Sequence, residues 1–162
     1  MTANRIPFML SRRERILKNI AGLAVRLIYR SVEVRQRDGE TTAGPQLSVS
    51  NHFGGFADAL IQAYALDRVP RFIARDVIWR YPVVGSLMDW VGGIPVHKPR
   101  DRGDADANTQ MFSTCYTALR AGGHLLIFPE GVTRNEPSMA EVKTGAARIA
   151  LGAADRVDTV VP

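Results

Sequence analysis

A histidine and an aspartate six positions apart form the stretch of this sequence best suited to acid–base chemistry. It reads Asn-His-Phe-Gly-Gly-Phe-Ala-Asp, from Asn51 to Asp58. A carboxylate that accepts a hydrogen bond from one imidazole nitrogen fixes the tautomer and lets the other nitrogen take a proton. Residues six apart on a regular helix lie about 240° apart, at roughly 100° per residue. His52 can therefore meet Asp58 only from outside the helix, folded back over its first turn, and Gly54-Gly55 permits such a turn.

The same pair also has an ordinary structural interpretation. His52 can hydrogen-bond within a loop while Asp58 caps or solvates the following helix, and short His–Asp spacings are common in proteins. Spacing alone leaves both interpretations open, so other polar stretches have to be considered.

Two later stretches place charge after predicted strands. The first, residues 92–100, carries Lys98 and Arg100. Two interpretations of these side chains are open, ligands of a phosphate or solvated surface charges. The second, Phe-Pro-Glu-Gly at residues 128–131, is followed by Arg134 and Lys143. Open α/β folds usually bind ligands at the carboxyl ends of their strands. These basic residues are therefore candidate contacts for an anionic ligand.

The apolar pattern predicts the elements that position these residues. Period-two alternation and short apolar runs indicate strands, and apolar residues at helical spacing indicate helices. We expect strands at residues 31–37, 47–49, 71–74, within 92–96, at 124–128 and from 157. We expect helices at residues 11–30, 56–66, 77–91 (broken by Pro82), 107–120 and 145–151. Residues 101–106 are expected to form a polar loop.

Length and composition indicate one folded domain. The chain has 162 residues, 46% hydrophobic and 23% charged, which suits a single core. Its net charge of +5 favours an anionic partner such as a phosphate compound, acidic lipid or nucleic acid, but no nucleic-acid motif is recognised. The one cysteine, Cys115, excludes an internal disulfide, and its apolar neighbours predict core packing rather than catalysis. No apolar run is long enough to span a membrane.

The predicted N-terminal helix, residues 11–30, is amphipathic and strongly basic. Two interpretations stay open: a helix packed on its own domain, or one that lies on an anionic membrane surface. Its apolar residues share one broad face, and six basic residues oppose a single acid. The apolar residues are Ile16, Leu17, Ile20, Leu23, Ala24, Leu27 and Ile28, and the basic ones Arg12, Arg13, Arg15, Lys18, Arg26 and Arg30.

Three of these stretches, in this order, resemble the glycerolipid acyltransferase family. They are the His52…Asp58 stretch, Gly-Gly-Ile-Pro-Val with its basic tail at residues 92–100, and Phe-Pro-Glu-Gly at residues 128–131. The family includes glycerol-3-phosphate and 1-acylglycerol-3-phosphate acyltransferases. The resemblance implies an α/β sandwich with a mixed central sheet flanked by helices. It divides the chain into an amphipathic helix, residues 1–30, and an incomplete catalytic domain, residues 31–162.

The resemblance also implies the chemistry. A fatty acyl group would pass from acyl-CoA or acyl carrier protein, the co-substrate, to a hydroxyl of a glycerol phosphate or lysophospholipid acceptor. His52 would be the base and Asp58 its partner, with no metal and no further cofactor. Glu130 and Gly131 would shape the acceptor site. The candidate phosphate contacts would be Lys98, Arg100, Arg134 and Lys143.

The sequence departs from the common family pattern at three points. Five residues rather than four separate His52 from the aspartate, so we expect Asp58, not the position of Ala57, to carry the carboxylate. Lys98 stands where arginine is usual, and lysine lacks the bidentate fork. Val132 precedes Thr133, where a hydroxyl residue usually follows the glycine directly.

A fourth family stretch begins near residue 160, and the resemblance implies that the chain is the N-terminal part of a longer acyltransferase. We expect a cytoplasmic protein, peripheral on the inner face of the cell membrane, with no nucleic-acid partner. The alternative is a catalytically weak phospholipid- or membrane-binding protein on the same scaffold.

Overall fold

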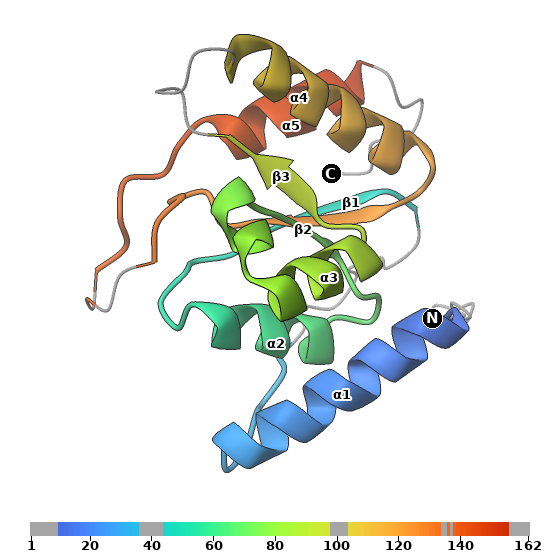
Figure 1. The fold of residues 1–162 in the computed structure, drawn as a ribbon, viewed down its shortest axis with the longest axis vertical. Helices are drawn as coiled ribbons and strands as arrows, with labels where there is room; N and C mark the ends of the chain where they lie inside the picture. The colour runs from blue at the N-terminus through green and yellow to red at the C-terminus, as the bar shows by residue number, and fades with distance from the viewer. Residues whose placement is uncertain (1–9, 36–43, 98–103, 134–135, 137, 156–162) are drawn as a thin grey trace, which may run out of the picture.

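A parallel sheet forms the centre of the protein (Figure 1). The computed structural model describes residues 10–35, 44–97, 104–133, 136 and 138–155. In these ranges the sheet has four strands in the order β1-β4-β2-β3, and every neighbouring pair is parallel. The strands are β1 (Gln46–Val49), β2 (Arg71–Arg75), β3 (Ile94–Val96) and β4 (His124–Ile127).

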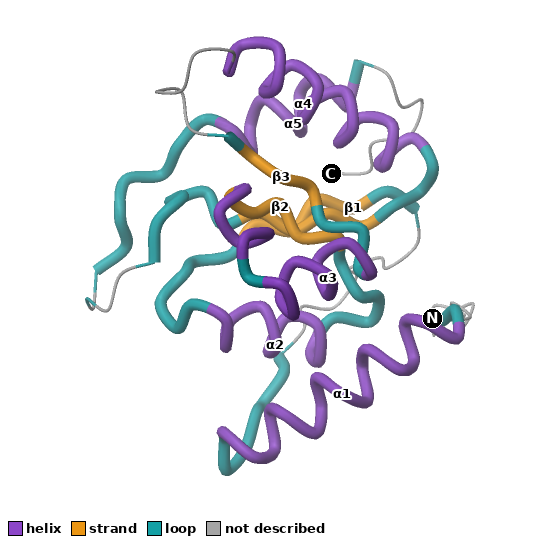
Figure 2. The backbone as a smooth tube through the Cα atoms, viewed as in Figure 1, coloured by secondary structure: helices purple, strands orange, loops and turns teal. Residues whose placement is uncertain are grey.

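Helices cover both faces of the sheet, as Figure 2 shows. On one face lie α2 (Phe56–Ala65), the short 3₁₀ helix η1 (Asp76–Arg80) and α3 (Pro82–Trp90). On the other lie α4 (Asp104–Arg120) and α5 (Gly145–Ala154). Successive strand residues point to opposite faces. Leu125 therefore joins the α4–α5 side of the core and Leu126 joins the α2–α3 side. The expected α/β architecture is confirmed.

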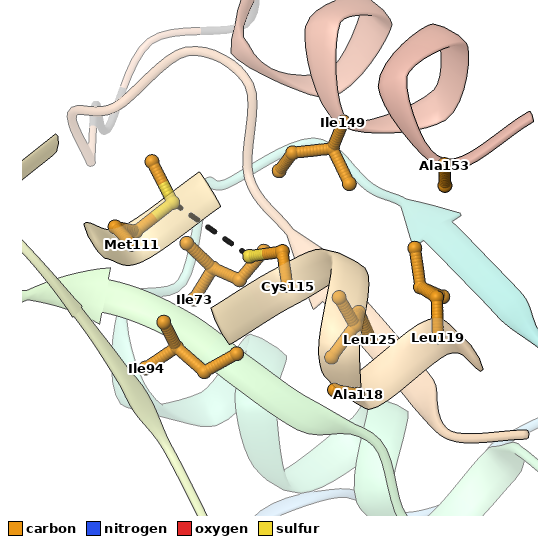
Figure 3. Packing of buried hydrophobic residues seen from close by; sticks show 9 residues of the cluster. All are labelled: Ile73, Ile94, Met111, Cys115, Ala118, Leu119, Leu125, Ile149 and Ala153. Atoms are coloured by element: carbon orange, nitrogen blue, oxygen red, sulfur yellow. Dashed lines mark hydrogen bonds between the residues drawn. The ribbon is translucent and has the colours of Figure 1, made fainter. Parts of the chain in front are cut away.

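Figure 3 shows the core under α4 and α5, where Cys115 is fully buried. Its thiol lies 3.6 Å from the sulfur of Met111, one helical turn earlier. Burial raises the pKa of the Cys115 thiol from its ordinary 9.0 to about 11, so the reactive thiolate is disfavoured. The expectation that this residue packs in the core is confirmed.

The N-terminal helix α1 (Arg12–Ile28) begins with a capping box. The Ser11 hydroxyl accepts from the Glu14 amide at 3.2 Å, and the Glu14 carboxylate accepts from the Ser11 amide at 2.9 Å. Such reciprocal bonds satisfy two of the donors that a helix start leaves unpaired. The helix packs on α2 through small residues, since Ala21, Gly22 and Val25 are its buried positions.

Two expected elements are wrong in the described residues. Residues 31–35 form no strand; Glu33 and Arg35 pair with each other at 2.9 Å on the surface. Without this strand, no antiparallel pairing is seen, and the described sheet is parallel rather than mixed. Helix α4 starts at residue 104, inside the expected polar loop. The strand expected from residue 157 lies outside the described residues.

His124 is a buried histidine at the start of β4, at the edge of the sheet opposite the His52 stretch. Its Nε2 lies 2.7 Å from the Ser48 hydroxyl, and the side chain is 5% exposed. Burial, helped by the positive charge of Arg68, lowers the pKa of His124 from 6.5 to about 4. The folded protein therefore holds this imidazole neutral at pH values where the unfolded chain is protonated.

This shift predicts a loss of stability in mild acid. Between pH 6.5 and 4 the unfolded chain binds a proton that folded His124 does not, so the free energy of unfolding falls as pH falls. We expect a loss of about 2 kcal/mol from His124 between pH 7.5 and 5. Urea unfolding at both pH values measures it. His124→Leu should remove this part of the pH dependence, and His97→Gln, which removes a half-buried histidine, should keep it. An equal slope in wild type and His124→Leu would refute the prediction.

Candidate active site

The loops that follow the four strands meet at the carboxyl edge of the sheet. Strand pairing aligns Val49, Ile127, Ile73 and Ile94 in one row across the sheet. Three residues beyond that row, each strand is followed by a titratable side chain. These are His52 after β1, Glu130 after β4, Asp76 after β2 and His97 after β3. Parallel strands thus bring together residues from distant parts of the sequence.

His52 and Asp58 form the expected pair. The ring Nδ1 lies 3.0 Å from Asp58 Oδ2, and both side chains are about one-fifth exposed. Asp58 sits in the first turn of α2, where the helix dipole stabilises a negative charge. Its Oδ2 also accepts from the Gly54 amide at 2.8 Å, which ties the carboxylate to the turn. With the longer spacing, Asp58 rather than the position of Ala57 lies against His52, and the catalytic role of the pair stays a prediction.

The glycine turn lets His52 fold back over the helix. Gly55, the residue before α2, has φ +60°, a conformation that side-chain-bearing residues rarely adopt. A Cβ on Gly54 would come within 2.9 Å of Asp58 Oδ1, so this position has no room for a larger residue unless the carboxylate moves. The turn therefore sets both the direction of the chain and the distance from His52 to Asp58.

Phe128 holds the other side of the imidazole. The rings of His52 and Phe128 stack with centroids 4.1 Å apart and planes inclined by 16°. The stacked aromatic ring restricts rotation of the imidazole and so fixes its orientation. Asp58 accepts from Nδ1 in this arrangement, and Nε2 is then the nitrogen that can act as a base. Phe128 belongs to the Phe-Pro-Glu-Gly stretch that directly follows β4, but the sequence pattern gave it no role beside the histidine.

Glu130 connects two backbone segments of the site. It is 1% exposed, and its two oxygens accept separate backbone bonds, one from the His52 amide and one from the Ala140 amide, each at 3.0 Å. The carboxylate therefore holds the loop after β1 to the segment before α5. Glu130 was expected to shape the acceptor site. Because its carboxylate is buried and accepts from backbone amides, it can do so only by fixing the position of that backbone.

Gly131 and Lys143 lie together at the rim of this loop. Gly131 has φ +64°, and a Cβ there would stand 2.9 Å from the Lys143 ammonium nitrogen. The Lys143 amide donates to the Pro129 carbonyl at 3.0 Å, which keeps the exposed lysine beside the third stretch. Lys143 is thus the candidate phosphate contact that the structure places at the site. Lys98, Arg100 and Arg134 lie outside the described residues.

A second histidine–carboxylate pair lies on the same edge. His97 Nδ1 is 3.1 Å from Asp76 Oδ2, and both side chains are more than one-third exposed. Sequence spacing gave no sign of this pair, since 21 positions separate the two residues. The parallel pairing register of β2 and β3 brings these two residues together.

Comparison with known proteins agrees with this fold. The sequence profile of the acyltransferase family matches residues 31–162, so the chain belongs to that family. Two relatives are chloroplastic 1-acyl-sn-glycerol-3-phosphate acyltransferases, from Arabidopsis thaliana and Brassica napus. They are 27% and 28% identical over 106 residues, which are 65% of this chain and 28% and 29% of theirs. The chain thus spans less than a third of these relatives.

A solved structure shares the fold. The crystal structure of the 1-acyl-sn-glycerophosphate acyltransferase of Thermotoga maritima matches with a TM-score of 0.69 and 18% identity. The match covers 90% of this chain and 58% of that one. Among the described residues, no helix has the length and apolar character needed to cross a membrane.

Proposed function

We propose that this protein transfers a fatty acyl group from a thioester to a hydroxyl of a glycerol phosphate. The observation that carries the proposal is the His52–Asp58 pair, at 3.0 Å, on the carboxyl edge of an acyltransferase-family fold. The two relatives are 1-acyl-sn-glycerol-3-phosphate acyltransferases, which favours 1-acylglycerol-3-phosphate as the acceptor here, with glycerol-3-phosphate as the alternative. Acyl-CoA and acyl carrier protein are both suitable donors, since each presents the same thioester.

The geometry supports general-base catalysis by His52. Its Nε2 would remove the proton of the acceptor hydroxyl as the oxygen attacks the thioester carbonyl. A carbon–oxygen bond forms, the carbon–sulfur bond breaks, and the imidazolium returns the proton to the leaving thiolate. Asp58 would hold the tautomer and stabilise the imidazolium, and Phe128 would limit ring rotation. No step in this sequence requires a metal, and the expected absence of one stays a prediction.

Lys143 would bind the phosphate of the acceptor, with Lys98, Arg100 and Arg134 as further candidates. The Lys143 ammonium lies against Gly131. Gly131 and Phe128 both belong to the loop that follows β4. Glycine at this position exposes the backbone, so an anion can approach both the loop and the charge. An ammonium at the rim would thus orient the glycerol phosphate toward the imidazole.

Removing this charge should weaken acceptor binding. A charge-assisted hydrogen bond contributes about 1.5–3 kcal/mol, so Lys143→Ala should raise the apparent dissociation constant of the acceptor about 10- to 150-fold. Titration of acceptor against the folded variants measures it, with Lys98→Ala, Arg100→Ala and Arg134→Ala alongside. The exposed-site variant Arg120→Ala is the matched control. Unchanged affinity in all four candidate variants would move the phosphate site elsewhere.

Helix α1 supports a second part of the proposal, docking on an anionic membrane. Its core contacts come from small residues, and its large aliphatic side chains stay outside the core, Leu27 being 79% exposed. Aliphatic side chains beside basic ones are typical of helices that lie in a membrane surface. The inner face of the cell membrane, where lipid acceptors reside, would then be the working location. The exposed aliphatic side chains of α1 are Ile16, Ile20, Leu23, Leu27 and Ile28.

Docking by charge predicts a salt-sensitive preference for anionic lipid. Each basic residue near an anionic surface adds about 1 kcal/mol, so changing Arg12, Arg13 and Arg15 to Gln should weaken binding about 100-fold at low salt. Vesicle co-sedimentation with neutral and anionic lipid measures it. Raising salt from 0.1 to 1 M shortens the Debye length from about 10 to about 3 Å and should weaken wild-type binding. Equal binding to both lipids would exclude electrostatic docking, whether or not the protein is an enzyme.

A further inference from the structure

A groove between α1 and α2 combines basic, polar and apolar groups outside the candidate active site. It has a volume of about 410 Å³, within the range of roughly 300–1,000 Å³ typical of small-molecule sites. It opens where the two helices approach closely, since a Cβ on Gly22 would lie 3.3 Å from the Tyr64 ring. The lining residues are Lys18, Asn19, Gly22, Leu23 and Arg26 of α1, and Tyr64 of α2.

The lining residues offer hydrogen-bond donors toward an anion. Within the described part of the chain, the side chains of Asn19, Arg26 and Tyr64 have no hydrogen-bond partner. Lys18 is different, because its ammonium donates to the carbonyls of Leu66 and Asp67 and thereby fixes α1 on the end of α2. Arg26 is therefore the cation of the groove that is free to bind an anion.

The position of the groove around α1 indicates which anion. At about 100° per residue, Lys18, Gly22 and Arg26 lie within an arc of roughly 80°. The exposed aliphatic side chains of Ile16, Leu23 and Leu27 occupy the adjacent sector, beyond Arg26 and away from the core. The polar groove and the aliphatic sector are thus parallel and adjacent along the helix. A ligand with a charged head and an apolar tail fits this arrangement, and Leu23 belongs to both parts.

We infer that this groove binds the phosphodiester headgroup of a single membrane phospholipid, with Arg26 and Tyr64 as its polar contacts and Leu23 against its acyl chains. The inference rests on the proposed membrane docking of α1 and adds a saturable, headgroup-specific site to it. It places the phosphate level of the bilayer beside α2, which also carries Asp58. The bound lipid would therefore hold the candidate active site at a fixed height above the membrane surface.

The test uses a soluble lipid so that the site can be measured without vesicles. Dihexanoyl phosphatidylglycerol, kept below its micelle-forming concentration, is titrated into the protein by calorimetry. We expect saturable binding that Arg26→Gln weakens about 10- to 150-fold and Tyr64→Phe about two- to tenfold. Arg120→Gln removes the same charge from an exposed position on α4, on the other face of the sheet, and should leave binding unchanged. Thermal melts establish that each variant is folded.

Two controls separate this site from the proposals above. Loss of binding in Lys143→Ala, with no loss in Arg26→Gln, would place the lipid at the candidate active site and overturn the inference. The deacylated headgroup, glycerophosphoglycerol, should bind much more weakly than the lipid; equal binding would mean a site for a free phosphate compound. Absence of saturable binding, or equal losses in Arg120→Gln and Arg26→Gln, would overturn the inference. If these results are obtained and the protein still binds anionic vesicles, the electrostatic docking of α1 is retained without the headgroup site. If the soluble lipid binds but vesicles do not, docking is rejected and the headgroup site is retained.

Discussion

His52→Ala should reduce the rate of acyl transfer by about 10²–10⁴-fold, the usual contribution of a general base. This corresponds to about 3–5 kcal/mol of transition-state stabilisation. The imidazole contacts Asp58 and the Phe128 ring, and its backbone amide is held separately by Glu130. Truncation of the side chain therefore removes the base while the loop keeps its anchor. The measurement is kcat/KM with saturating donor and varied acceptor.

Asp58→Asn should also lose activity, because the amide can donate to Nδ1 and hold the wrong tautomer. The second histidine–carboxylate pair supplies a matched control, since Asp76→Asn makes the same change at a bond of similar length. We expect Asp76→Asn and His97→Ala to lose less than about tenfold. Near wild-type rates in His52→Ala, with large losses in His97→Ala, would transfer the role of base to the other histidine.

Glu130→Ala should destabilise the fold by about 2–6 kcal/mol. The carboxylate accepts from the amides of His52 and Ala140, and each buried donor left unpaired costs about 1–3 kcal/mol. That loss is large against a typical stability of about 5–15 kcal/mol. Urea unfolding measures it. Where the variant still folds, acyl transfer should fall too, because the backbone of His52 loses its anchor.

Two further variants make the Glu130 result specific. Glu130→Gln keeps the size of the side chain but replaces one acceptor oxygen with a donor, so it should be destabilised although no cavity forms. Glu141→Gln changes an exposed carboxylate on the neighbouring segment and should keep wild-type stability. Wild-type stability in Glu130→Gln would show that the two backbone contacts contribute little.

The sequence predicts the helices, the strands of the sheet and the His52–Asp58 pair because each rests on local chemistry. Apolar periodicity specifies the buried faces, and the glycine turn specifies how the chain returns over α2. The strand expected at residues 31–37 is absent over the described residues 31–35, because a local pattern cannot supply a pairing partner. Alternation of apolar and charged residues satisfies a strand, but a strand also needs a partner, and none pairs with residues 31–35 in the described sheet.

The rest of the site depends on strand order, which local pattern does not contain. The β1-β4-β2-β3 order places Phe128 on His52 and Asp76 beside His97. Helix α1 shows the same limit. Periodicity identified a broad apolar face, but the smaller residues Ala21, Gly22 and Val25 make the core contacts, since close approach to α2 favours them. Amphipathic pattern alone cannot tell which part of an apolar face is buried.

The most direct test of the proposed function is acyl transfer by the purified full-length protein. Labelled acyl-CoA and acyl carrier protein thioesters are each offered with 1-acylglycerol-3-phosphate and with glycerol-3-phosphate, and esterified product is measured. The prediction is product from at least one donor and acceptor combination, at a rate that His52→Ala lowers by about 10²–10⁴-fold. No product from any combination, with folded protein that still binds anionic vesicles, would contradict the enzyme and favour a phospholipid-binding protein on the acyltransferase scaffold.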